Sequence, residues 1–123
     1  MFTSQLKDFE MAFYSMRFLE ELLGKIPIVH IDDACEAHIF CIENLSIRGR
    51  FLVASSYVST LDIANYYLQS YQEFHVKQKY LDGPKRDIKW ASTKLADKGF
   101  AYKYDMKMIL DDCIKCARRM GDL

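Results

Sequence analysis

The 123-residue sequence has few glycines, and they stand far apart. The five glycines occupy positions 24, 49, 83, 99 and 121, so none has another glycine within six residues. A loop that holds the phosphates of a nucleotide exposes its backbone amides through closely spaced glycines. The spacing therefore excludes a phosphate-binding loop of the G-x-G-x-x-G or Walker type from these residues.

A tyrosine and lysine pair for proton transfer is also missing. None of the eight tyrosines is followed four residues later by a lysine. That Y-x-x-x-K arrangement places an ammonium beside a phenol and lowers the pKa of the phenol. We therefore assign no catalytic residue, and we expect no dinucleotide cofactor to bind to this chain alone.

The chain lacks both a charge excess and a long apolar run. Its 17 Lys and Arg residues balance 17 Asp and Glu residues, which argues against general attraction to nucleic acid or to an anionic membrane. No apolar stretch approaches the roughly 18 residues of a membrane span, and the N-terminus has no secretory pattern. We expect a cytoplasmic protein with no membrane span and no nucleic-acid partner.

What the sequence does contain is enough apolar material for one packed core. Half of the residues are hydrophobic, 14% are aromatic and 28% are charged, as in a globular chain. At this length residues 1–123 are expected to form one compact domain or a piece of a larger one.

Three segments have the apolar periodicity of helices, namely residues 6–23, 59–71 and 105–121. Gly24 is placed to end the first of them. Ser59 and Asp62 resemble a capping box at the start of the second, and Asp105 is a natural cap for the third.

Short apolar runs between these helices predict strands. The clearest are residues 26–31 and residues 50–54, where four consecutive apolar residues suit a sheet covered on both faces. Asp32 or Asp33 is placed to cap a helix between the two strands. Cys35, His38, Ile39 and Ile42 are predicted to share one face of that helix. The alternation of strand and helix predicts the α/β class, with parallel pairing of the strands.

The spacing of the four cysteines indicates packing in the core more than metal binding. Cys113 and Cys116 form one C-x-x-C pair, but Cys35 and Cys41 supply no second pair of zinc type. His38 and Cys41 would need ligands from elsewhere to hold a metal. We therefore expect free, buried thiols and no metal site.

His30, Asp32 and Asp33 form the densest group of titratable side chains. They follow a predicted strand, at a position where active sites of α/β folds often lie. Catalysis is one interpretation; the other is a capping aspartate beside a hydrogen-bonded core histidine, and it is favoured because both features are common in folded chains.

One segment mixes cations with aromatic side chains. It contains Lys77, Lys79, Tyr80, Lys85, Arg86, Lys89 and Trp90. Such a mixture is typical of surfaces that bind single-stranded nucleic acid, but Asp82 and Asp87 dilute the charge. An ordinary solvated face is the favoured interpretation.

An ordered series of short motifs is similar to a known family. The stretch IPIVHIDDACEAHIFCIE is followed by GRFLVASS and then by KWASTKLADKGFAYKYDMKMILDDCIKCARRMG. This series, over about residues 13–123, resembles the C-terminal part of plant NADPH-dependent reductases of the extended short-chain dehydrogenase branch. That branch contains dihydroflavonol, anthocyanidin, vestitone and HC-toxin reductases.

The resemblance implies an incomplete Rossmann-type fold in which residues 1–123 are a single partial domain, the C-terminal substrate-side portion. Members bind NADPH through a Gly-rich loop and carry a Ser/Thr, Tyr and Lys catalytic set, both located before the region matched here. NADPH is thus the implied cofactor of the whole protein, and residues 50–55 would be a late strand of its sheet.

The resemblance also places Pro27 and His30 on the substrate side. Dihydroflavonol reductases have glutamine at the position of Pro27. The proline therefore removes a side chain that could form hydrogen bonds with a hydroxylated ring. The implied function is a fragment, inactive alone, of an oxidoreductase that acts on a carbonyl or CH–OH group of a flavonoid-like or related phenolic substrate.

The alternative function is a non-catalytic module that associates with a full-length reductase. An unpaired strand at residues 50–54 would favour association with another chain, and so would the apolar helix faces of Phe13 and Met106 if they stayed uncovered.

Overall fold

Helices dominate the computed structural model, which describes residues 3–4, 8–78, 81 and 93–121. In chain order the elements are α2 (Glu10–Leu23), β1 (Ile26–Ile28), α3 (Ile31–Glu43), β2 (Ser56–Val58), α4 (Thr60–Ser70), α5 (Lys94–Asp97) and α6 (Met106–Arg119). No helix in these ranges is both long enough and apolar enough to cross a membrane.

The local capping predictions are confirmed at two helices. The Ser59 hydroxyl accepts the Asp62 amide and the Asp62 carboxylate accepts the Ser59 amide, which completes the capping box of α4. Asp105 caps α6 by accepting the Met108 amide. These bonds span three residues, so the local sequence is sufficient to specify them.

Helix α2 follows a residue in the left-handed conformation. It begins at Glu10, after Asp8, whose φ of 57° interrupts a helix. Residues 6–7, where the periodicity predicts the start of the helix, lie outside the described residues. Gly24, with φ of 82°, ends the helix as expected.

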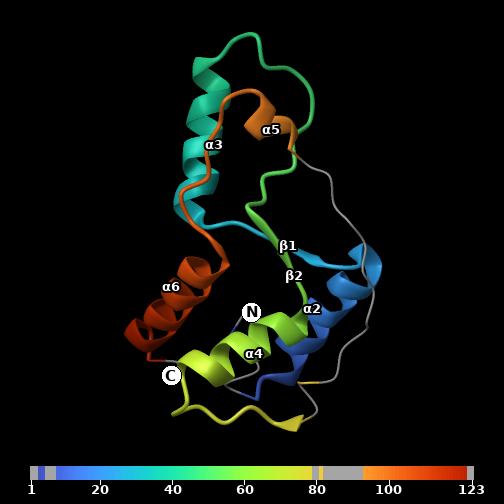
Figure 1. Ribbon diagram of the computed structural model, residues 1–123, viewed down its shortest axis with the longest axis vertical. Helices are drawn as coiled ribbons and strands as arrows, with labels where there is room; N and C mark the ends of the chain where they lie inside the picture. The colour runs from blue at the N-terminus through green and yellow to red at the C-terminus, as the bar shows by residue number, and fades with distance from the viewer. Residues whose placement is uncertain (1–2, 5–7, 79–80, 82–92, 122–123) are drawn as a thin grey trace.

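The two strands pair antiparallel, which corrects the predicted parallel arrangement. Ile26 lies opposite Val58 and Ile28 lies opposite Ser56. After α3 the chain returns alongside this helix, so β2 meets β1 from the opposite end (Figure 1). Residues 51–54 are not a strand, because no neighbouring strand lies beside them in the described part of the chain.

One large apolar cluster, here called the main core, joins α2, the β1–β2 pair, α4 and α6. Its buried members are Phe13, Met16, Ile26, Ile28, Val58, Ile63, Ala64, Tyr67, Val76, Ile109, Leu110 and Ile114. A charged residue is buried beside this core: the carboxylate of Glu20 is fully buried and accepts the Thr60 amide. Its carboxylate therefore meets the positive N-terminal end of α4.

A second cluster, here called the small core, lies between α3 and α5 at the other end of the molecule (Figure 1). Its buried members are Ala37, Leu95 and Phe100, with Phe40, Cys41, Phe51, Val53 and Tyr102 packed around them. The face of α3 that Cys35, His38, Ile39 and Ile42 share is exposed, and the buried residues of this helix are Asp33 and Ala37. Both faces of this helix are apolar, so periodicity alone did not decide between them.

Candidate functional site

His30 is the N-cap of α3, where an aspartate was expected. Its Nδ1 atom accepts the Asp32 amide at 3.0 Å, in place of the oxygen that a capping side chain normally supplies. An acceptor at Nδ1 requires a free lone pair, so the ring proton lies on Nε2. The prediction that Asp32 or Asp33 caps this helix is therefore wrong.

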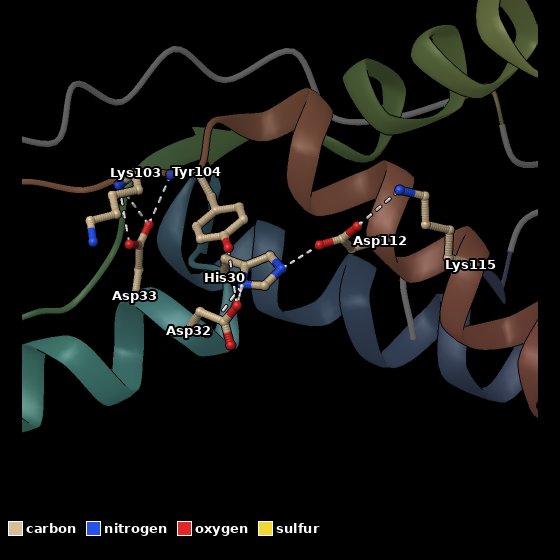
Figure 2. Close-up of polar contacts among 7 residues, drawn as sticks. All are labelled: His30, Asp32, Asp33, Lys103, Tyr104, Asp112 and Lys115. Atoms are coloured by element: carbon tan, nitrogen blue, oxygen red, sulfur yellow. Dashed lines mark hydrogen bonds and ion pairs between the residues drawn. The ribbon is translucent and has the colours of Figure 1, made fainter.

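The second ring nitrogen of His30 joins α3 to α6. Nε2 lies 2.6 Å from Oδ2 of Asp112, 82 residues further along the chain, and donates the ring proton to that carboxylate (Figure 2). Lys115 lies 3.7 Å from the other carboxylate oxygen of Asp112. His30 itself is only 8% exposed, so the cluster is held at the edge of the interior.

Tyr104 covers the imidazole of His30. The two rings are stacked with centroids 3.8 Å apart and an angle of 10° between their planes. The Tyr104 hydroxyl donates to Asp32 at 3.0 Å, and this bond to a carboxylate raises the pKa of Tyr104 above its ordinary value. Asp32 thus stabilises the neutral phenol and holds the ring over His30.

Asp33 anchors the segment that leads into α6. Its carboxylate is buried and accepts the amide of Lys103 at 3.1 Å and that of Tyr104 at 3.0 Å (Figure 2). Backbone donors compensate a buried carboxylate for its lost hydration. Asp33 therefore ties the small core to the start of α6.

The hydrogen bonds of His30, Asp32, Asp33, Tyr104 and Asp112 join α3 to α6 and to the segment before it. Both nitrogens of His30 are already occupied by hydrogen bonds. The carboxylates of Asp33 and Asp32 accept from the backbone and from Tyr104. The described residues hold no group of three or more potential metal ligands.

Pro27, the other residue expected on the substrate side, lies in β1 opposite Tyr57. It is half-buried, and no described contact joins it to the His30 cluster. The two residues therefore lie on one short segment, but Pro27 faces Tyr57 of β2 whereas His30 contacts Asp32 and Asp112.

The remaining candidates are dispersed. Lys77 pairs with Asp8, whereas the other members of the mixed cation and aromatic segment lie outside the described residues. The four thiols are free, but Cys35 and Cys116 are exposed, so the expectation of uniformly buried thiols is wrong. His38 donates from Nδ1 to the carbonyl of Ala34 within its own helix.

Tyr104 and Asp112 were missed by the sequence analysis. Each lies more than 70 residues from its partner in the cluster, and the family motifs that contain them do not indicate that contact. A weak indication was present, because Asp111 and Asp112 follow each other on a helix with a strongly apolar stripe. Asp111 also serves a purpose that its sequence position does not indicate: one of its oxygens accepts the hydroxyls of Tyr66 and Tyr71, each at 2.7 Å.

The chain is similar to plant reductases over nearly all of its length. It is 29% identical over 113 residues to an anthocyanidin reductase of Vitis vinifera that forms (2S)-flavan-3-ols, a match that covers 91% of this chain and 33% of that protein. It is 33% identical over 97 residues to dihydroflavonol 4-reductase of Arabidopsis thaliana, covering 77% of this chain and 25% of that protein. No protein-family model matches the sequence.

The same relation holds in three dimensions. Vestitone reductase from alfalfa superposes on 80% of this chain with a TM-score of 0.67 and 29% identity, and the match covers 33% of that structure. The chain spans about one third of the length of the curated relatives it matches. The resemblance inferred from the motifs is confirmed.

Proposed function

We infer that this homologue of the plant anthocyanidin, dihydroflavonol and vestitone reductases supplies the C-terminal, substrate-side portion of an NADPH-dependent oxidoreductase. The reaction is hydride transfer at a carbonyl or CH–OH group of a flavonoid-like or related phenolic substrate. One observation carries the proposal: the match includes 91% of this chain but only 33% of the Vitis reductase, so most of that relative has no counterpart here.

Residues 1–123 are inactive on their own under this proposal. Hydride transfer needs a nicotinamide held against the substrate and a proton donor beside it. This sequence contains neither a Gly-rich phosphate loop nor a Y-x-x-x-K pair. His30 does not replace the proton donor under this proposal, because its Nε2–H forms a hydrogen bond with Asp112 and does not point to a substrate.

The contribution of the chain is then to shape the substrate side. Pro27 presents an apolar ring where a glutamine would offer hydrogen bonds, which favours a substrate with little polarity at that point. His30 acts through position, since it fixes the corner between the segment of Pro27 and α3.

Cofactor binding and complementation test the proposal. Titration of NADPH into the purified chain should give no saturable binding. Co-expression with the portion of the Vitis anthocyanidin reductase that this chain does not match should yield NADPH oxidation with a phenolic carbonyl substrate, and that portion alone is the control. Micromolar binding of NADPH by the chain alone would contradict its inactivity.

A non-catalytic module that binds a complete reductase is the second candidate. It is favoured by large apolar side chains on α2 and α3 that are exposed to solvent. The expectation of an uncovered face at Phe13 is wrong, because Phe13 is buried in the main core. Sedimentation of the chain mixed with intact Vitis reductase distinguishes the two functions. A stable complex without a change in activity supports the module, whereas an unchanged monomer rejects it.

A further inference from the structure

Two of the four thiols face one groove beside α6. Cys113 and Cys116 line a hollow of about 260 Å³ between α6 and the start of α3, next to the hydrogen bond from His30 to Asp112. They lie three residues apart in α6, where helix geometry places their Cα atoms about 5 Å from each other. A disulfide spans Cα atoms at this separation, so the two sulfur atoms can be joined by a covalent bond.

The two thiols differ in accessibility. Cys116 is exposed and lies in the last turn of α6, whereas Cys113 is partly buried and packs against the main core. Burial raises the pKa of the Cys113 thiol above its ordinary value, so this thiol is mostly protonated at neutral pH. The attacking species in disulfide exchange is a thiolate, and a bulky disulfide reaches only an exposed sulfur. Cys116 is therefore the sulfur that an external disulfide meets first.

A cationic side chain lies at the exposed thiol. Nη2 of Arg119 donates a long hydrogen bond to Sγ of Cys116 at 3.9 Å. The neighbouring cations Lys115 and Arg118 form ion pairs with carboxylates of the chain. The charge of Arg119 attracts an anionic reactant to this sulfur. Oxidised glutathione, a disulfide that carries several carboxylates, has the matching charge.

We propose that Cys113 and Cys116 form a reversible redox pair that is oxidised by an anionic disulfide of the glutathione class. The Cys116 thiolate attacks one sulfur of oxidised glutathione, and one glutathione leaves as a thiolate that takes up a proton. Cys113 then loses its proton to solvent and attacks the Cys116 sulfur, which releases the second glutathione. Two protein thiols are thus oxidised to one disulfide, while one glutathione disulfide is reduced to two thiols. This chemistry is separate from the proposed hydride transfer.

Helix α3 supplies a matched control pair. Cys35 is exposed and Cys41 is partly buried, as Cys116 and Cys113 are. Six residues of helix hold the Cα atoms of Cys35 and Cys41 about 10 Å apart, beyond the roughly 7 Å that a disulfide can span. This pair can therefore take up glutathione, but it cannot bridge while α3 is intact.

Mass spectrometry after incubation with oxidised glutathione tests the pair. Trypsin cleaves after Lys115, so a bridge joins the two peptides that contain Cys113 and Cys116, and excess reduced glutathione should reopen it. Cys35 should carry glutathione and form no bridge to Cys41. In urea, where α3 is unfolded, these two should bridge as well. Circular dichroism of the oxidised chain without urea should show native helix content.

Single substitutions separate the roles of the two thiols. Cys113→Ser should stop the reaction at a mixed disulfide between Cys116 and glutathione. In the Cys116→Ser variant, Cys113 should take up glutathione about tenfold or more slowly than Cys116 does in the first variant, because Cys113 is partly buried. Cys35→Ser with Cys41→Ser is the matched control and should bridge as the wild-type chain does.

Arg119→Gln tests the charge at the exposed thiol. This variant should react with oxidised glutathione about threefold or more slowly, and high salt should remove the difference. Its rate with the uncharged hydroxyethyl disulfide should match that of the wild-type chain. Four results would each overturn the proposal: a wild-type chain that stops at a mixed disulfide on Cys116, a bridge between Cys35 and Cys41 without urea, loss of helix content on oxidation, or equal slowing of Arg119→Gln with both disulfides.

Discussion

The main core and the small core differ in how completely the chain closes them. The main core contains twelve described buried residues contributed by helices on several sides, whereas the small core contains three. Burial of apolar surface supplies most of the stability of a folded domain, at roughly 25 cal/mol for each Å². The main core therefore supplies more of the burial that stabilises the described chain than the small core does.

The joint between the two regions is polar. His30, Asp33 and Tyr104 connect α3 to the segment before α6 through hydrogen bonds and ring stacking. Hydrogen bonds of this kind give direction but modest net stability, about 1 kcal/mol each. The position of the small core thus depends more on these directional hydrogen bonds and the ring stacking than on buried apolar surface.

The largest effect is expected from a cavity in the main core. Leu110→Ala should lower the free energy of unfolding by about 3–5 kcal/mol, because Leu110 is fully buried among residues that cannot collapse inward. Leu95→Ala in the small core should cost about 2 kcal/mol, since a shallow cluster relaxes around the missing atoms. Urea unfolding midpoints give both values. An equal or larger loss for Leu95→Ala would reverse the ranking of the two cores.

A smaller effect is expected at the joint. Asp33→Ala should cost about 1–3 kcal/mol, because it leaves the part-buried amides of Lys103 and Tyr104 without their acceptor. Asp33→Asn, which keeps one acceptor oxygen, should lose less. Hydrogen exchange of the amides of Lys103 and Tyr104 should be faster in the alanine variant, while the amide of Leu110 should stay protected. If exchange at Leu110 were accelerated equally, the two regions would unfold as one unit.

The smallest effect is an alkaline one, confined to the main core. Burial, together with the hydrogen bond to Asp111, raises the pKa of Tyr71 to about 12 from an ordinary value of 10.0. Below pH 10 neither the folded nor the unfolded chain ionises this phenol, so its stabilising contribution is fully present. The contribution is lost as the pH rises from 10 towards 12.

Tyr71→Phe should make the decline in stability over this alkaline range less steep. Tyr66 is its natural companion, because it donates to the same Asp111 oxygen and its pKa is raised by burial as well. The double variant with Tyr66→Phe should therefore show a shallower decline still. Denaturation followed at several alkaline pH values, with phenolate absorbance as the probe of ionisation, measures both. An unchanged slope in the double variant would contradict the assignment.

The sequence predicted the helices and their caps better than it predicted which other elements each helix or strand contacts. The ends at Gly24, Ser59 and Asp105 were foreseen because each depends on residues within one turn. The inward face of α3 and the direction of the strand pair were not, because a helix with two apolar faces fits either orientation. His30 was identified as a hydrogen-bonded residue, but its partner Asp112 was not.

Sequence alone determined that no phosphate loop and no tyrosine and lysine pair lie within these residues, since both motifs are defined by spacing along the chain. It also determined the kinship with the plant reductases, which the ordered motifs carry. Only the tertiary structure decided that Asp33 meets the backbone 70 residues away and that the outer face of α3 stays open. Contacts between distant residues depend on how whole elements pack, and the packing of one element is set by all the others.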